Sequence, residues 1–264
     1  MFDLSSYLYG LVVLAVFVIG GWLVSLSKRD VSIVDSLWSI MFMLTAITYY
    51  LTLPATGPRA VLVLLLVSVW ALRLSLYITW RNWGEPEDWR YQEIRANNEP
   101  NFAIKSIYIV FLLQAGLAWI ISLPLLTATY SHTPLGILDY VGVVLWLVGM
   151  VFEAGGDHQL QRFKSDPNSR GKVLNSGLWR YTRHPNYFGN ACIWWGFGLM
   201  GCAAGSWWIL ISPVIMTFLL LKISGVTLTE KDIVKRRPGY TDYIEQTNAF
   251  FPGLPKSSTP TNKE

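Results

Sequence analysis

Residues 183–189 (Arg-His-Pro-Asn-Tyr-Phe-Gly) hold the densest set of chemically useful side chains in the sequence. A cation, an imidazole, an amide and a phenol fall within five positions, immediately before a long apolar stretch. Pro185 removes a backbone donor, and Gly189 leaves room for a large group near the backbone. Two interpretations follow. The segment binds a polar ligand beside a membrane, or it is an interfacial anchor with Arg183 on lipid phosphates and Tyr187 among interfacial aromatic residues.

A stripe of polar residues precedes this motif. Its members are spaced by four, four and three residues, which places them on one helical face: Glu153, Asp157, Gln161 and Lys164. Carboxylates and amides accept hydrogen bonds from hydroxyl groups, and neighbouring cations neutralise phosphates. Unless the stripe is only a solvated helix face, it predicts a ligand with both hydroxyl groups and negative charge.

Ionisable residues also interrupt the apolar runs, namely Asp35, Arg73 and Lys222. Such groups are costly in hydrocarbon and usually face a cavity or a partner. Asp35 and Arg73 therefore indicate a cavity, or a salt bridge between the two. Lys222 is expected to snorkel to the interface. Residues 85–91, which mix acidic, basic and aromatic side chains, are a candidate lid over the cavity opening.

The composition predicts an integral membrane protein. Of the 264 residues, 52% are hydrophobic and only 14% are charged, and the mean hydropathy is +0.36. We expect an all-α, polytopic fold with about seven transmembrane helices. Apolar runs near the roughly 20 residues that cross a bilayer occupy 7–26, 32–53, 60–79, 103–126, 137–152 and 187–228, the last with a break at 201–206.

The distribution of lysine and arginine predicts the orientation of these spans. Cations cluster after the first, third, fifth and seventh spans, whereas the other connections hold only Arg59. Cytoplasmic loops retain positive charge, so the amino terminus should lie outside and the carboxyl terminus in the cytoplasm. The net charge of +4 follows from this topology and requires no nucleic-acid partner. The first run lacks the flanks of a signal peptide and is expected to be a retained helix.

The sequence favours one membrane-embedded domain over residues 1–255, followed by a disordered tail at 256–264. Neither the two cysteines, Cys192 and Cys202, nor the three histidines have metal-ligand spacing, so we expect no metal. The cysteines are expected to be packing residues.

Residues 176–189, followed by Tyr240-x-x-Tyr243 and by Phe-Phe-Pro at 250–252, resemble the carboxyl-terminal region of the steroid 5-alpha-reductase family, including its bacterial members. They are also similar to the membrane sterol reductases. The resemblance is strong over 145–252 and loose over the first spans. It implies an NADPH-binding half at 136–255 and a substrate side at 1–135. Together with the polar stripe it implies these cofactor-binding residues: Arg73, Asp157, Gln161, Lys164, Arg183, His184, Asn186, Tyr187, Glu230, Arg236 and Tyr240. Lys164 and Glu153 depart from the pattern, which has an arginine and an asparagine there.

The implied reaction is NADPH-dependent reduction of a carbon-carbon double bond in a lipophilic enone, such as a 3-oxo-4-ene steroid that enters from the bilayer. Charge grows on the carbonyl oxygen, so a hydrogen-bond donor at that oxygen stabilises the transition state. In the family a membrane carboxylate and a tyrosine have this role. Asp35 and Tyr77 are the candidates, although Asp35 stands where the family has a Gln-Glu pair. We expect membrane lipids, but no obligatory protein partner, around a site that faces the cytosol. We expect the membrane to be the bacterial inner membrane, or the endoplasmic reticulum in a eukaryote.

Two other classes of function stay open. Membrane methyltransferases of the isoprenylcysteine and phospholipid type use S-adenosylmethionine and share Arg-His-Pro-x-Tyr-x-Gly. Asn186 and the preceding Gly-Leu-Trp at 177–179 favour a reductase instead. A transporter is the third class, together with a non-catalytic lipid-binding protein, but the sequence shows no two related halves of the kind that many transporters have.

Overall fold

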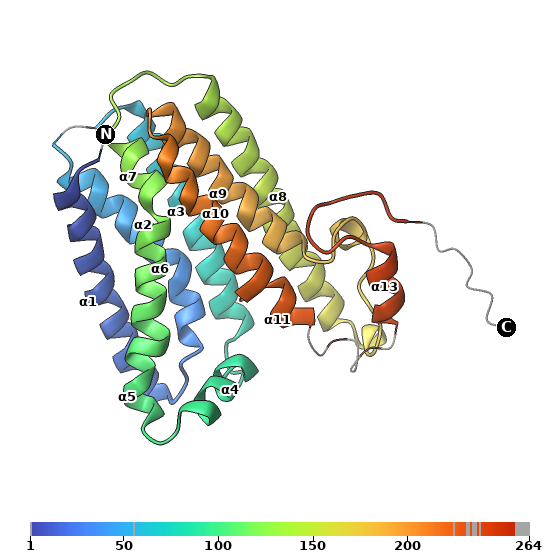
Figure 1. Ribbon diagram of the computed structural model, residues 1–264. Coiled ribbons are helices and arrows are strands. Elements are labelled where there is room, and N and C mark those ends of the chain that lie inside the picture. Colours follow the sequence, from blue (N-terminus) through green and yellow to red (C-terminus); the bar gives the residue numbers. More distant parts are fainter. Residues whose placement is uncertain are drawn as a thin grey trace. The chain divides into compact units, whose positions relative to one another are not determined.

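The structure is a computed structural model that describes residues 2–54, 56–223, 225–230, 233, 237 and 239–256. Throughout these residues the regular secondary structure is helical, so the all-α prediction is confirmed (Figure 1). Arg236 and the predicted tail beyond Lys256 lie outside the described residues. The chain divides into two compact units. Unit 1 comprises Met1–Asp139 and Leu199–Ser212, and unit 2 comprises Tyr140–Gly198 and Pro213–Glu264.

Five helices are long and apolar enough to cross a membrane. They are α1 (Leu4–Lys28), α2 (Ile33–Thr52), α3 (Pro58–Arg81), the continuous helix Phe102–Ile121, and α8 (Ile137–Ser165). A shorter apolar helix covers Trp207–Ile223, and α9 covers Pro185–Ala203. The protein is therefore a polytopic integral membrane protein with five to seven spans.

The sequence predicted most of these boundaries. The break expected at 201–206 is confirmed, because α9 ends at Ala203 and the next helix begins at Trp207. The fourth span is shorter than predicted. It ends at Ile121 rather than at residue 126, because Pro124 starts a new helix, α7 (Leu123–Thr129), and proline favours the first turn of a helix over its interior.

Shorter elements connect or follow the long helices, or make up the fourth span (α5, η1 and α6) and the helix Trp207–Ile223 (η4, α10 and η5). They are α4 (Trp89–Asn98), α5 (Phe102–Ser106), the π-helical turn η1 (Ile107–Leu112), α6 (Leu113–Ile121), η2 (Pro167–Ser169), η3 (Gly177–Arg180), η4 (Trp207–Leu210), α10 (Ile211–Phe218), η5 (Leu219–Ile223), α11 (Val226–Glu230) and α13 (Tyr240–Gln246). The two cysteines are buried and free, which confirms that they are packing residues.

Exposed aromatic residues mark both ends of unit 1. At the end where α3 finishes, Trp80 and Trp83 are 62% and 79% exposed. At the other end, where α1 begins, Trp207 and Trp208 are also exposed, and the ring of Trp208 lies 5.8 Å from that of Phe2. Tryptophan is enriched at both membrane–water interfaces. The two groups therefore support a membrane-spanning orientation of the helices between them.

In unit 2, glycines allow α8 and α9 to approach closely. A Cβ atom at Gly189 would lie 2.4 Å from the backbone nitrogen of Glu153 and 2.5 Å from the carbonyl oxygen of Gly149. A Cβ at Gly196 would lie 2.7 Å from the carbonyl oxygen of Gly142. Small residues permit such contacts between membrane helices. The contact places the polar face of α8 against the first turns of α9, where the sequence motif lies.

Candidate functional site

The motif at 183–189 lies at the start of α9, and the C-terminal segment holds it there. The backbone nitrogen of Arg183 donates to the carbonyl oxygen of Asn248 at 2.9 Å. The hydroxyl of Thr182 donates to the carbonyl oxygen of Phe250 at 2.9 Å, and the backbone nitrogen of Gly253 donates to the carbonyl oxygen of Tyr181 at 3.0 Å. The two segments that carry the family resemblance are therefore neighbours in space.

Four of the predicted cofactor-binding residues contact one another around the carboxylate of Glu230. Arg183 donates from Nε to Oε1 at 2.7 Å and from its second terminal nitrogen to Oε2 at 3.0 Å. His184 Nε2 lies 2.9 Å from Oε1, and the hydroxyl of Tyr240 donates to the same oxygen at 3.3 Å. The remaining guanidinium nitrogen binds the carbonyl oxygens of Thr247 and Ile244, at 2.6 and 3.2 Å. All three nitrogens of Arg183 thus have acceptors within the protein.

The electrostatics of this cluster favour the ionised forms of Glu230 and Arg183. Burial alone would raise the pKa of Glu230, but hydrogen bonds from His184 and Arg183 outweigh burial and lower that pKa to about 2. Burial likewise opposes the charge of Arg183, yet the hydrogen bond and the charge of Glu230 raise the pKa of Arg183. Burial, with the nearby charge of Glu230, raises the pKa of Tyr240 above its ordinary value, so Tyr240 stays protonated.

Beside this cluster, two amide–carboxylate pairs join α9 to α8. Asn186 donates to Asp157 Oδ1 at 3.2 Å, and Asn190 donates to Glu153 Oε1 at 2.9 Å. Both carboxylates are buried, at 5% and 3% exposure. The amide oxygen of Asn190 is buried and accepts no hydrogen bond from the described residues. Buried acceptors of this kind suit a ligand that carries hydroxyl or amide donors.

The same face of α8 continues outward from these pairs. Gln161 is half-buried and Lys164 is exposed, so the predicted polar stripe leads from the interior to the surface. The ring of Tyr187 stacks on that of His184, with centroids 5.3 Å apart and planes 9° apart. The structure therefore gathers the described members of the predicted site in unit 2 into one region, apart from Arg236, which lies outside the described residues.

Sequence analysis missed Asn190 and left Glu153 out of the predicted ligand residues. A signal for both was present. Asn190 follows Asn186 by four residues, and Asp157 follows Glu153 by four residues. Residues four apart share a helix face, so two facing helices with this spacing can form two such pairs. Sequence analysis did not take into account the glycines that bring α8 and α9 together.

A second cluster surrounds Asp35 in unit 1. Arg90 donates to Asp35 Oδ2 at 2.6 Å, and the hydroxyl of Tyr91 donates to Oδ1 at 2.6 Å. Gln114 donates to the Tyr91 oxygen at 3.2 Å. Gln114 follows a π-helical turn, a feature frequent at functional sites. Arg90 is thus an ion-pair partner of Asp35, a contact that sequence analysis, which offered Arg73 as the partner, did not predict.

The contact with Arg90 arises because α4 carries Arg90 and Tyr91 to the first turn of α2. These two residues are 55 and 56 positions from Asp35, so spacing gave no signal for the contact. The guanidinium of Arg73 lies 5.5 Å from the ring centre of Tyr77, and that of Arg81 lies 5.8 Å from the same ring. The described residues contain no group of three or more His, Cys, Asp or Glu side chains that could hold a metal ion.

The fold and these clusters define a polytopic helical membrane protein with polar, partly buried side-chain groups at the ends of its helices. The family model described as "Protein of unknown function (DUF1295)" matches residues 21–247. The chain belongs to this family.

Two kinds of relative were found among known proteins. The chain is 28% identical over 290 residues to an uncharacterized protein of Schizosaccharomyces pombe, covering 96% of this chain and 81% of that protein. It is 40% identical over 58 residues to 3-oxo-5-alpha-steroid 4-dehydrogenase 1 of Mus musculus, covering 22% of this chain and 23% of that protein. The Homo sapiens protein of the same name is 34% identical over 59 residues. Each match to a steroid dehydrogenase thus spans only about a quarter of either chain.

Proposed function

We propose that this protein is an NADPH-dependent reductase that acts on the carbon-carbon double bond of a lipophilic enone, such as a 3-oxo-4-ene steroid. The observation that carries the proposal is the 40% identity over 58 residues to 3-oxo-5-alpha-steroid 4-dehydrogenase 1. The motif at 176–189 adds to it. The proposal places the cofactor site toward the cytosol of a bacterial inner membrane, or of the endoplasmic reticulum in a eukaryote, because cations cluster on that side.

The polar residues of unit 2 suit particular parts of NADPH. The buried carboxylates of Glu153 and Asp157 and the amide oxygen of Asn190 can accept hydrogen bonds from ribose hydroxyls and from the carboxamide. Lys164 is exposed at the outer end of the same helix face, where a phosphate would meet it. When bound, NADPH supplies a hydride to the beta carbon of the enone.

Arg183 has a different role in this proposal. Four of its five N–H donors already bind Glu230 and two carbonyl oxygens, so most of its hydrogen-bonding capacity is used within the protein. It holds the motif against α11 and the C-terminal segment, and thereby positions Asn186 opposite Asp157. We propose this positioning role for Arg183, and its contact with the cofactor stays a prediction.

The hydroxyl of Tyr91 is our candidate for the hydrogen-bond donor at the enone oxygen. Burial raises the pKa of Tyr91 well above its ordinary value, and the charge of Asp35 raises it further, so the hydroxyl keeps its proton. Rotation about the C–O bond would turn that proton from Asp35 to the substrate. Asp35, whose carboxylate accepts hydrogen bonds from Arg90 and Tyr91, then orients the donor rather than acting as the acid. Tyr77 remains the second candidate.

Incubation of the purified protein with NADPH and a 3-oxo-4-ene steroid tests this function. NADPH should be oxidised only when the enone is present, and mass spectrometry should find a product two hydrogens heavier. A saturated 3-oxo steroid is the matched control, because it lacks only the double bond. Oxidation at the same rate with both steroids, or with neither, counts against the proposal.

A further inference from the structure

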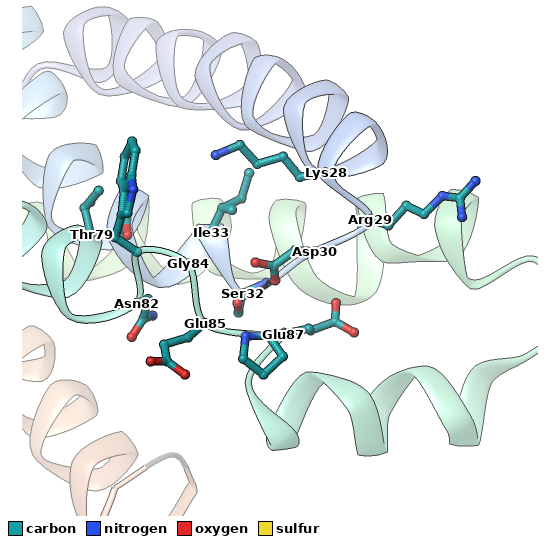
Figure 2. Close-up of a pocket in the computed structure, with 13 residues that line it drawn as sticks. Lys28, Arg29, Asp30, Ser32, Ile33, Thr79, Asn82, Gly84, Glu85 and Glu87 are labelled. Atoms are coloured by element: carbon teal, nitrogen blue, oxygen red, sulfur yellow. Dashed lines mark hydrogen bonds between the residues drawn. The ribbon is translucent and has the colours of Figure 1, made fainter.

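A pocket of about 420 Å3 opens in unit 1 between the ends of three membrane-spanning helices. Its walls come from the end of α1, the first turns of α2, the end of α3 and residues 82–87 (Figure 2). Glu87 fixes the outer wall, because it accepts a hydrogen bond from the backbone nitrogen of Val31 at 2.9 Å and pairs with Arg95 at 2.8 Å. The pocket is therefore built from anchored residues, and its volume suits a small ligand.

The position of the pocket indicates which molecules reach it. α1 ends at Lys28, α2 begins at Ile33 and α3 ends at Arg81, so the pocket lies at the level where the spans leave the membrane. Trp83, which lines the pocket, is 79% exposed and belongs to the aromatic group at this end. Interfacial tryptophans sit at the depth of lipid headgroups. Lipid headgroups are therefore present at high local concentration around this pocket.

Two lining residues carry charged groups with hydrogen-bonding capacity that the described residues leave unused. The ammonium group of Lys28 lies 6.0 Å from the centre of the Trp83 ring, and it has no hydrogen bond or ion pair with the described residues. Asp30 uses Oδ1 to accept from the nitrogen and the hydroxyl of Ser32, at 2.8 and 2.5 Å. Its Oδ2 accepts from none of the residues that the structure describes. Arg29, by contrast, points away from the other lining residues (Figure 2).

We propose that this pocket binds the zwitterionic headgroup of a membrane phospholipid, with Lys28 on the phosphate and Asp30 on the ammonium group. A primary ammonium donates three hydrogen bonds, whereas a trimethylammonium donates none. The pocket should therefore prefer an ethanolamine headgroup to a choline headgroup. A glycerol headgroup carries no cation for Asp30, so an anionic lipid should also bind less well.

Native mass spectrometry can measure these preferences on the purified full-length protein. The probes are phosphatidylethanolamine, phosphatidylcholine and phosphatidylglycerol with identical acyl chains. The ethanolamine lipid should bind about tenfold more tightly than either of the others, as expected for one charge-assisted hydrogen bond. Soluble phosphoethanolamine is a fourth probe. If it binds as tightly as the lipid, the ligand is a free phosphate ester and the lipid proposal is overturned.

Three variants make the test specific for the pocket. Asp30→Asn should remove most of the preference for ethanolamine while keeping an acceptor for Ser32. Lys28→Gln should weaken the binding of all three lipids, because each of them carries the phosphate that Lys28 contacts. Arg29→Gln is the matched control, because it removes one positive charge next to Lys28 from a side chain that points away. It should keep the preference. Equal binding of the three lipids, or equal losses in Lys28→Gln and Arg29→Gln, would reduce the effect to general surface attraction and overturn the proposal.

Discussion

Two arginine–carboxylate clusters lie at opposite ends of the antiparallel helices α2 and α3, and they differ in how completely they are closed. Near the start of α3, Arg59 pairs with Asp139 at 2.6 Å, and the two side chains are 1% and 0% exposed. At the start of α2, Arg90 pairs with Asp35 at 2.6 Å, with 27% and 17% exposure. The shortest nitrogen–oxygen distance is the same in both, but Arg59 binds both carboxylate oxygens of Asp139 whereas Arg90 binds one oxygen of Asp35. Only the second cluster is open to solvent.

The partners of the two clusters explain the difference. The other donors of Arg59 bind Ser131, Thr133 and the carbonyl oxygen of Pro134, so the guanidinium is fully satisfied. The open cluster includes the Tyr91 hydroxyl, which can exchange its partner for a ligand. A fully buried ion pair holds chain segments together, whereas a partly exposed cluster can contact a ligand and take part in a reaction. The sealed pair also explains the single cation in the loops predicted to lie outside, since Asp139 neutralises Arg59.

The largest expected effect concerns the sealed cluster. Asp139→Ala leaves the Arg59 cation buried without a counter-charge, which should lower the free energy of unfolding by about 3–5 kcal/mol. Thermal unfolding in detergent measures this loss. The double variant Arg59→Leu/Asp139→Leu should regain much of it, because apolar replacement of both partners removes the stranded charge. An unchanged melting temperature in Asp139→Ala would show that the Arg59–Asp139 pair does not stabilise the fold.

The open cluster should respond in activity rather than in stability. Tyr91→Phe removes the proposed donor, and turnover of the enone should fall about 100-fold, while NADPH affinity and melting temperature stay near those of the parent protein. Tyr77→Phe is the comparison variant and should lose much less. If Tyr77→Phe shows the larger loss, the donor is Tyr77 and the open cluster is not the site of the chemistry.

A smaller effect is expected at the amide–carboxylate pairs of unit 2. Asp157→Asn removes a buried charged acceptor, which should weaken NADPH binding about tenfold. Calorimetric titration gives the affinity directly. Asp166→Asn is the matched control, because it makes the same substitution at an exposed carboxylate that caps η2. Similar losses in both variants would mean that general charge near the end of α8, and not the buried pair, governs binding.

The smallest effect concerns Glu230, which is intermediate in exposure at 18%. Its pKa falls from 4.5 to about 2 in the folded protein, so the folded state binds fewer protons than the unfolded chain. The stability that Glu230 contributes is therefore complete above about 4.5 and is lost as the pH falls toward about 2. Relative to Glu230→Gln, the parent protein should be more stable by about 1 kcal/mol near neutral pH. If the parent protein stays more stable than Glu230→Gln in acid, this prediction is contradicted.

The sequence was informative where a pattern is local. Apolar runs predicted the spans, and Gly-Cys-Ala-Ala-Gly-Ser at 201–206 predicted the break after α9. The four-residue spacing of Glu153 and Asp157 predicted one polar face. The contacts of Asp35 were not predictable, because Arg90 and Tyr91 belong to a different segment that folds back onto α2. The Glu230 cluster was predictable as a set of residues but not as mutual contacts, since no spacing relates residue 183 to residue 230.

The central claim, that the motif at the start of α9 serves a nicotinamide cofactor, is tested most directly by one competition experiment. The purified protein is titrated calorimetrically with NADPH, alone and in the presence of S-adenosylmethionine. The reductase account predicts saturable NADPH binding that S-adenosylmethionine does not displace, and weakening of that binding in Asp157→Asn. Binding of S-adenosylmethionine without any binding of NADPH would contradict it and indicate a methyltransferase.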